Sequence, residues 1–275
     1  MQRLHDTEEK IYMSKIRAAF EKGKALIAFI TCGDPDLETT VAAVQAAAEN
    51  GAGLIELGIP FSDPTAEGPV IQESSIRALE GGITTDKVLA FVKDLRKTVT
   101  IPLVFKTYAN VVFSYGAERF FASCGEAGVD GIVLPDLPFE EKEEFQDVSR
   151  KYGVELISMI APAKAERIAK IASEAEGFVY VVPGHEKKTA GCGACKGNGS
   201  SVIRDLSAIT EIIRQNTDVP CAIFCESGEK GQLIEAAGVS DGVIVEETVV
   251  SLLAEYGKEA PAHVGEYVRS LKEVL

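Results

Sequence analysis

The run ELGIPFSDPTAEGPVIQ, residues 56–72, follows the apolar run GAGLI at residues 51–55 and is the most informative part of this chain. A continuous apolar run is typical of a strand that is buried on both faces, as in a parallel sheet. Glu56 lies at the end of this predicted strand, and Glu67 follows in a loop rich in Gly and Pro. A strand and a loop that each deliver a carboxyl group can bring two proton-transfer groups into one pocket.

Seven further apolar runs alternate with amphipathic helical patterns, as expected for successive βα units. The eight predicted strands cover residues 25–31, 53–59, 103–108, 130–136, 155–161, 178–182, 221–225 and 241–246. Helical patterns between them include residues 37–50, 84–97, 116–128 and 139–153. Eight units in a chain of 275 residues predict an α/β fold of the (β/α)8 TIM barrel class.

No linker or change of composition divides the chain, so we expect a single barrel domain over residues 1–275. An extra helix at residues 9–22 is expected to close the barrel bottom. The net charge of −14 and the lack of a basic stripe argue against nucleic acid or an anionic membrane as a partner. The N-terminus has no apolar signal core, which favours a cytoplasmic location. Four of the six cysteines fall in or beside predicted strands and helices, which favours reduced, buried thiols.

Polar residues near the predicted strand ends are the candidates for chemistry, because the active site of such a barrel lies at the carboxyl ends of its strands. These candidates are Glu56, Lys106, Tyr108, Asp136 and Tyr180. Side chains alternate along a strand, so residues of equal parity share the barrel interior. A hydrogen-bonded structural role is the alternative for each of them. It is least satisfactory for Glu56, because an acid between Ile55 and Leu57 is costly to bury unless it is paired or used.

The run from residue 56 closely resembles the signature ELGIPFSDPxADGPxIQ of the tryptophan synthase alpha subunit family, with Glu67 where the family carries Asp. Three other segments resemble the family as well: AFITCGDPD at 28–36, which contains Phe29, KTYANVVF at 106–113 and VLPDLPFEE at 133–141. The resemblance therefore extends over most of the chain.

The resemblance implies a lyase that cleaves indole-3-glycerol phosphate into indole and glyceraldehyde 3-phosphate without a cofactor. Glu56 would be the acid/base of this aldol cleavage, and Glu67 would hydrogen-bond the indole nitrogen. Phe29 would contribute to substrate binding. A beta-type tryptophan synthase subunit is the partner that the family implies.

Three further acidic residues depart from the family pattern where the phosphate would bind. The family has GFGIS and GSA after its last two strands, whereas this chain has FCESG at 224–228 and EET at 246–248. Glu226, Glu246 and Glu247 thus replace residues that contact phosphate. A carboxylate ~4 Å from a phosphate charge costs roughly 4 kcal/mol per unit pair at an effective dielectric of 20.

We therefore expect weak binding of phosphorylated ligands, unless these acids point outward to solvent. Two alternatives follow from this departure. One is a diverged paralogue that acts on an uncharged or cationic substrate, and the other is a non-catalytic partner of a beta-type subunit.

Lys106 and the loop at residues 183–201 are two more departures from the family. A Lys in the barrel interior can form a Schiff base if its pKa is lowered, or it can form a buried ion pair with Glu56 or another of these acids. The loop holds Cys192 and Cys195, a CxxC pair that resembles half of a zinc site. Because further ligands beyond His185 are missing, we expect a mobile loop and no metal.

Overall fold

A computed structural model describes residues 14–184, 199–226 and 228–275, with only the backbone described for residues 199–204. Eight parallel strands follow one another around a closed barrel, and the last strand pairs with the first. They are β1 (Ala25–Thr31), β2 (Leu54–Gly58), β3 (Leu103–Lys106), β4 (Gly131–Val133), β5 (Glu155–Ile160), β6 (Val179–Val181), β7 (Cys221–Cys225) and β8 (Gly242–Val245). The predicted (β/α)8 barrel is confirmed.

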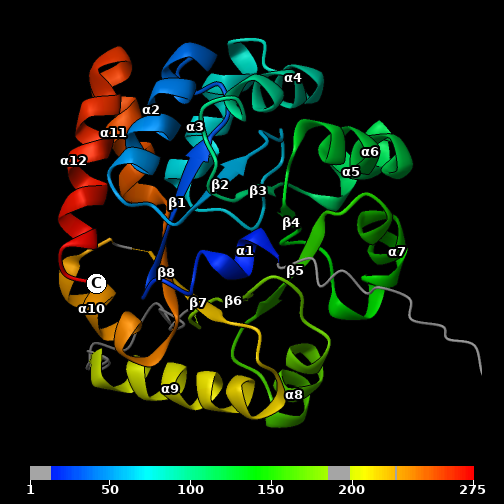
Figure 1. The fold of residues 1–275 in the computed structure, drawn as a ribbon, viewed down its shortest axis with the longest axis vertical. Helices are drawn as coiled ribbons and strands as arrows, with labels where there is room; N and C mark the ends of the chain where they lie inside the picture. The colour runs from blue at the N-terminus through cyan, green and yellow to red at the C-terminus, as the bar shows by residue number, and fades with distance from the viewer. Residues whose placement is uncertain (1–13, 185–198, 227) are drawn as a thin grey trace, which may run out of the picture.

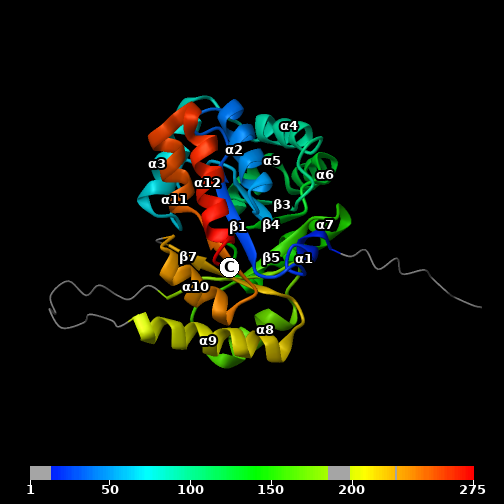
Figure 2. The ribbon, with the colours of Figure 1, turned by 60° about the vertical axis from the view of Figure 1, so that its left-hand side comes forward.

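Helices surround the strands on the outside of the barrel (Figure 1). Before β4 they are α1 (Lys15–Ala18), α2 (Leu37–Glu49), α3 (Pro69–Glu80), α4 (Thr85–Leu95), α5 (Ala109–Tyr115) and α6 (Ala117–Ala127). After β4 they are η1 (Phe139–Glu141), α7 (Glu143–Lys151), α8 (Ala165–Ser173), α9 (Gly199–Asn216), α10 (Lys230–Val239), α11 (Glu247–Tyr256), η2 (Gly257–Glu259) and α12 (Ala260–Lys272). Helix α12 packs on α2, and α9 packs on α8, which closes the helical layer (Figure 2).

The short helix α1 closes the barrel at the amino ends of the strands, as predicted. Its Ile16 is fully buried and packs in one cluster with interior side chains of the barrel, among them Ile27, Leu54 and Phe178. The helix is shorter than the expected range of 9–22, because it ends at Ala18 and residues 19–24 form turns and bends. Residues before 14 lie outside the described part of the chain.

Alternation along the strands sorts the side chains into two sets. Val104, Ile157 and Ile244 face the barrel interior, and their neighbours along the chain face the helices. The same parity directs Glu56 and Lys106 into the barrel, because each lies two residues after an interior side chain. The side chain of each of these two polar residues is buried.

Two strands end two or three residues earlier than the sequence predicts. Strand β3 ends at Lys106 rather than residue 108, and β4 ends at Val133 rather than residue 136. After these points the backbone turns away to begin the next loop or helix, so Tyr108 and Asp136 are not strand residues. Their parity therefore does not fix where their side chains point.

The loop that carries Glu67 is anchored by the helix that follows it. Arg77 of α3 forms two hydrogen bonds of 2.8 Å to the buried Asp34 in the loop after β1. Thr31, the last residue of β1, and Ser74 of α3 form a further buried hydrogen bond of 2.8 Å. Helix α3 is thereby fixed against the carboxyl end of β1, which holds the preceding loop at the mouth of the barrel.

Candidate active site

A cavity of about 930 Å³ opens at the carboxyl ends of the strands. This volume lies within the usual range for small-molecule sites, roughly 300–1,000 Å³. The predicted residues that line it are Glu67, Lys106, Tyr180, Glu226, Glu246 and Glu247. The mouth of the barrel thus brings together six of the ten residues that the sequence singles out.

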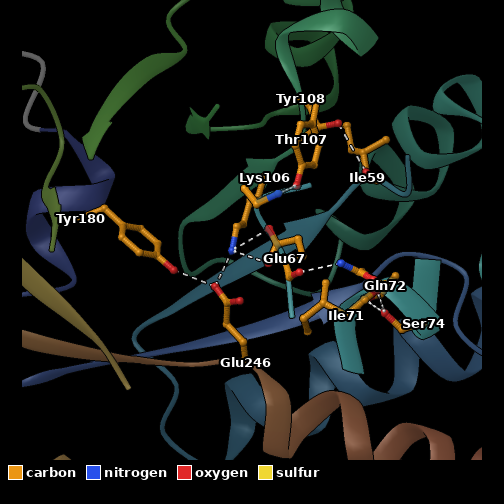
Figure 3. Close-up of polar contacts among 12 residues, drawn as sticks. Ile59, Glu67, Ile71, Gln72, Ser74, Lys106, Thr107, Tyr108, Tyr180 and Glu246 are labelled. Atoms are coloured by element: carbon orange, nitrogen blue, oxygen red, sulfur yellow. Dashed lines mark hydrogen bonds and ion pairs between the residues drawn. The ribbon is translucent and has the colours of Figure 1, made fainter. Parts of the chain in front are cut away.

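Lys106 is the centre of a buried charged cluster in this cavity (Figure 3). Its Nζ lies 2.7 Å from Oε1 of Glu246 and 3.2 Å from Oε1 of Glu67. Tyr180 donates its hydroxyl to the same Oε1 of Glu246 at 2.7 Å. These contacts confirm the predicted buried ion pair and show that its partners are Glu246 and Glu67.

The charges around Lys106 decide its protonation. Burial lowers the pKa of the Lys106 ammonium, but the charges of Glu246, Glu67 and Glu56 outweigh this effect and raise the pKa above its ordinary value. Nucleophilic attack on a carbonyl needs the neutral amine. The arrangement therefore favours a permanent cation over a Schiff-base lysine.

Glu56 is buried beside this cluster, 1% exposed, and neither of its carboxyl oxygens has a hydrogen-bond partner among the described residues. Burial raises the pKa of Glu56 well above its ordinary value. The charge of Lys106 lowers it, and the charges of Glu246 and Glu67 raise it further. A raised pKa favours the protonated form of the carboxyl group, which can act as an acid.

Phe29 lies next to Glu56, because the two residues are paired in the register of β1 and β2. Its ring is 5.2 Å from the Lys106 ammonium. The ring also packs over Gly58, where a Cβ atom would lie 2.5 Å from the Phe29 ring. Glycine at this position therefore allows the ring to lie across the barrel mouth.

Glu67 reaches the cluster from the loop after β2, as predicted. Burial raises the pKa of Glu67, the charge of Lys106 lowers it, and the charge of Glu246 adds to the rise. Gln72 of α3 donates to the Glu67 backbone carbonyl at 2.8 Å, which ties the residue to the start of that helix. Glu67 therefore presents its carboxyl group from a fixed backbone.

Tyr108 and Asp136, two of the candidates for chemistry, each form a hydrogen bond with the backbone. The Tyr108 hydroxyl accepts a hydrogen bond of 2.9 Å from the Ala66 amide, beside Glu67. Asp136 accepts one of 2.9 Å from the Ala109 amide at the start of α5. Neither residue lines the large cavity, and both hold neighbouring loops in place.

The three acids at the predicted phosphate site differ in burial and orientation. Glu246 is 1% exposed and turned inward to Lys106, Glu247 is partly buried, and Glu226 is exposed. Burial raises the pKa of Glu247, and the charges of Glu226 and Glu246 raise it further. Glu226 and Glu246 are therefore both close enough to act on Glu247, and the alternative of an outward orientation fails for Glu246.

Several cavity residues were not singled out from the sequence. Met159 and Phe224 line the cavity from β5 and β7, and both could have been found by the parity of their strands. Leu137 and Pro138 line it from the loop after β4, and Glu235 from α10. No sequence signal marked these last three, because loop and helix residues reach the mouth only through tertiary packing.

The described residues include no candidate metal site, and their cysteines are buried. Within residues 14–184, 199–226 and 228–275, no group of three or more His, Cys, Asp or Glu side chains is placed to hold a metal ion. Cys32, Cys124, Cys221 and Cys225 are buried free thiols, as the sequence predicted. The CxxC pair and His185 lie outside the described residues. No described helix has the length and apolar character that a membrane span needs.

The fold and the site define a class: a (β/α)8 barrel with an acid/base pocket at the carboxyl ends of its strands. A family model described as tryptophan synthase alpha chain matches residues 15–274. The chain therefore belongs to the tryptophan synthase alpha chain family.

Named relatives are similar to this chain over nearly its whole length. The tryptophan synthase alpha chain of Lacticaseibacillus casei is 40% identical over 94% of this chain and 95% of its own length. That of Caldanaerobacter subterraneus is 42% identical over 93% and 95%. The solved alpha subunit from Legionella pneumophila superposes with a TM-score of 0.82 at 33% identity, over 95% of this chain and 98% of that one.

Proposed function

We propose that this chain is a lyase of the tryptophan synthase alpha type, which cleaves indole-3-glycerol phosphate to indole and glyceraldehyde 3-phosphate. The observation that supports this most directly is Glu56, a buried carboxyl group with a raised pKa at the barrel mouth. Cleavage requires a proton on the ring carbon and removal of a proton from the side-chain hydroxyl. Both are acid–base steps, so this chemistry needs no cofactor.

The other residues of the site fit binding of an indole ring. Met159 and Phe224 offer apolar surface in the cavity. Glu67 is placed to accept a hydrogen bond from the ring nitrogen and to stabilise the positive charge of the protonated ring. Lys106 fixes Glu67 by an ion pair at 3.2 Å, so its carboxyl group is oriented before the substrate arrives.

We also propose a partner subunit for this chain, from the solved structures of its relatives. Solved relatives include tryptophan synthase from Mycobacterium tuberculosis and a tryptophan synthase complex from Pyrococcus furiosus, at 28% and 30% identity. We propose that this chain likewise docks on a beta-type subunit, in the cytoplasm.

The test is a product assay on the purified chain, alone and with a beta-type subunit. Indole and glyceraldehyde 3-phosphate should appear in equal amounts from indole-3-glycerol phosphate. The Glu56→Gln variant is the matched negative control, because the amide keeps the size of the side chain but cannot exchange a proton. Absence of both products under both conditions would refute the proposal.

A further inference from the structure

Lys106 places a positive charge in the wall of the cavity that is proposed to bind the indole ring. The ammonium group is buried, and its Nζ lies 5.2 Å from the centre of the Phe29 ring and 5.8 Å from that of the Tyr180 ring. Protonation of the indole ring during the proposed cleavage turns that ring into a cation. An uncompensated ammonium group in the wall would repel it, so the cleavage requires that the charge of Lys106 be compensated.

Glu246 supplies the closer of the two carboxyl groups that compensate Lys106. Its Oε1 lies 2.7 Å from Lys106 Nζ and accepts a hydrogen bond of 2.7 Å from the Tyr180 hydroxyl (Figure 3). Glu67 is the second acid, and its nearer carboxyl oxygen lies 3.2 Å from the same Nζ. Glu246 therefore forms the shorter ion pair, and Tyr180 holds its carboxyl group in that position.

The sum of the charges in this cluster shows what Glu246 does for Glu67. Lys106 contributes one positive charge, and Glu67 and Glu246 contribute one negative charge each when they are ionised. The three groups together then carry a net negative charge, which attracts a cationic ring. Without Glu246, the charges of Lys106 and Glu67 would cancel. Because all three side chains are largely buried, such a change is weakly screened by water.

We propose that Glu246 is a positioning residue for the cleavage: it neutralises Lys106, so that Glu67 keeps its negative charge available for the protonated ring. The cavity should then bind a flat bicyclic cation more tightly than a neutral ring of similar shape. This inference rests on the proposed function, because the ring becomes a cation only in that reaction. It also accounts for the joint presence of Lys106 and Glu246, two departures from the family pattern that the structure brings into contact.

The other charged groups of the cavity do not compensate Lys106 in this way. Among the described residues, no third acid forms an ion pair with it. The raised pKa of Glu56 favours its neutral form. Arg167, the other cation among the described residues of the cavity wall, is paired with Glu140 at 2.6 Å and is exposed. The charge balance at the ring is therefore set by the three residues of the ion-pair cluster.

The test compares binding of N-methylquinolinium, a flat bicyclic cation, with binding of quinoline, its uncharged counterpart. Calorimetry gives both dissociation constants for the wild-type chain, for Glu246→Gln and for the double variant Lys106→Met with Glu246→Gln. Glutamine keeps the size of the side chain and an oxygen that can accept from Tyr180, so the charge is what changes. Glu155→Gln is the control, because Glu155 bonds to Ser14 at the opposite end of the barrel.

The wild-type chain should bind the cation at least about tenfold more tightly than the neutral ring. In Glu246→Gln we expect this preference to fall about tenfold or more, because the charge of Lys106 is no longer compensated. The double variant should regain most of the preference, since it loses the repelling charge as well. With indole-3-glycerol phosphate, kcat should fall about tenfold or more in Glu246→Gln without a rise in KM, and recover in the double variant.

Either of two results would overturn the inference: a wild-type chain without a preference for the cation, or a preference that is equal in wild type and Glu246→Gln. A double variant that prefers the cation no more than Glu246→Gln would overturn it as well. A merely structural role of Glu246 would lower the free energy of unfolding without separating the two probes.

The probes need no turnover, so they test the charge balance separately from the proposed function, which absence of cleavage by the wild-type chain would refute. If Glu246→Gln does not fold, Lys106→Met takes its place in the comparison. Lys106→Met keeps both acids and should prefer the cation more strongly than the wild-type chain and the double variant. Equal preferences in these three proteins would then overturn the role of Glu246.

Discussion

The acidic side chains at the two ends of the barrel are paired in different ways. At the amino ends of the strands, Asp130 is bonded to Arg96 and to the Leu103 amide at 2.9 Å, and Lys15 lies 3.4 Å away. At the carboxyl ends, the single cation Lys106 forms ion pairs with two acids, Glu67 and Glu246. Glu56 beside them has no hydrogen-bond partner among the described residues. The first end satisfies its charges and stabilises the fold, whereas the second keeps proton-binding groups available for chemistry.

The largest expected effect tests whether interior carboxyl groups at the two ends differ in function. Glu56→Gln should lower the rate of indole formation by about 100- to 10,000-fold, because the group that supplies the proton is lost. Glu155→Gln should leave this rate unchanged. Steady-state assays on folded, purified variants measure both, and equal losses in the two variants would contradict the comparison.

Removing the cation from each end should show how differently the two sets of acids depend on it. Lys106→Met leaves Glu246 and Glu67 without their counter-charge, so we expect a loss of roughly 3–5 kcal/mol in the free energy of unfolding. Arg96→Met should cost less, because Asp130 keeps the Leu103 amide and Lys15. Urea unfolding followed by circular dichroism measures both, and the reverse order would show that the amino end depends more on its cation.

The acids at the rim should weaken phosphate binding. We expect Glu226→Gly with Glu247→Ser to bind glycerol phosphate at least about tenfold more tightly than wild type, because repulsion is removed and backbone amides become approachable. Glu246 is left in place here, since its removal would also free the charge of Lys106. Calorimetry measures the affinity, with Glu155→Gln as a control for removal of a carboxyl group at the opposite end of the barrel. Micromolar binding by the unmodified chain would show that the acids do not oppose phosphate.

The smallest expected effect is the contribution of Glu56 to the pH dependence of the free energy of unfolding. Because its pKa is raised on folding, the stability it contributes is fully present below its unfolded pKa, about 4.3, and is lost as pH rises through the folded value. Between these values the wild-type chain should lose up to about 1.4 kcal/mol per pH unit relative to Glu56→Gln. Unfolding titrations at several pH values measure the difference, and a flat difference would contradict the raised pKa.

Local patterns were sufficient for most of the architecture. The apolar runs are buried on both faces in the barrel, so the eight strands could be recognised from composition, and two of them, at 25–31 and 221–225, match their predicted bounds. Errors arose where a strand ends. The backbone leaves the sheet at Lys106 and Val133. Thr107 and Tyr108 gave no sign of the first end, whereas Pro135 could have marked the second.

The sequence by itself determined the barrel, the family and the convergence of Glu56, Lys106 and Glu67 at one end, because side-chain alternation and the order of the strands are local properties. Only the tertiary structure decided how these groups are paired. Glu246 follows Lys106 by 140 residues, yet their charged atoms lie 2.7 Å apart. That contact joins the ends of β3 and β8, and no local pattern encodes which side chains meet there. Tertiary packing also buries Glu56 beside this pair, and that burial raises its pKa.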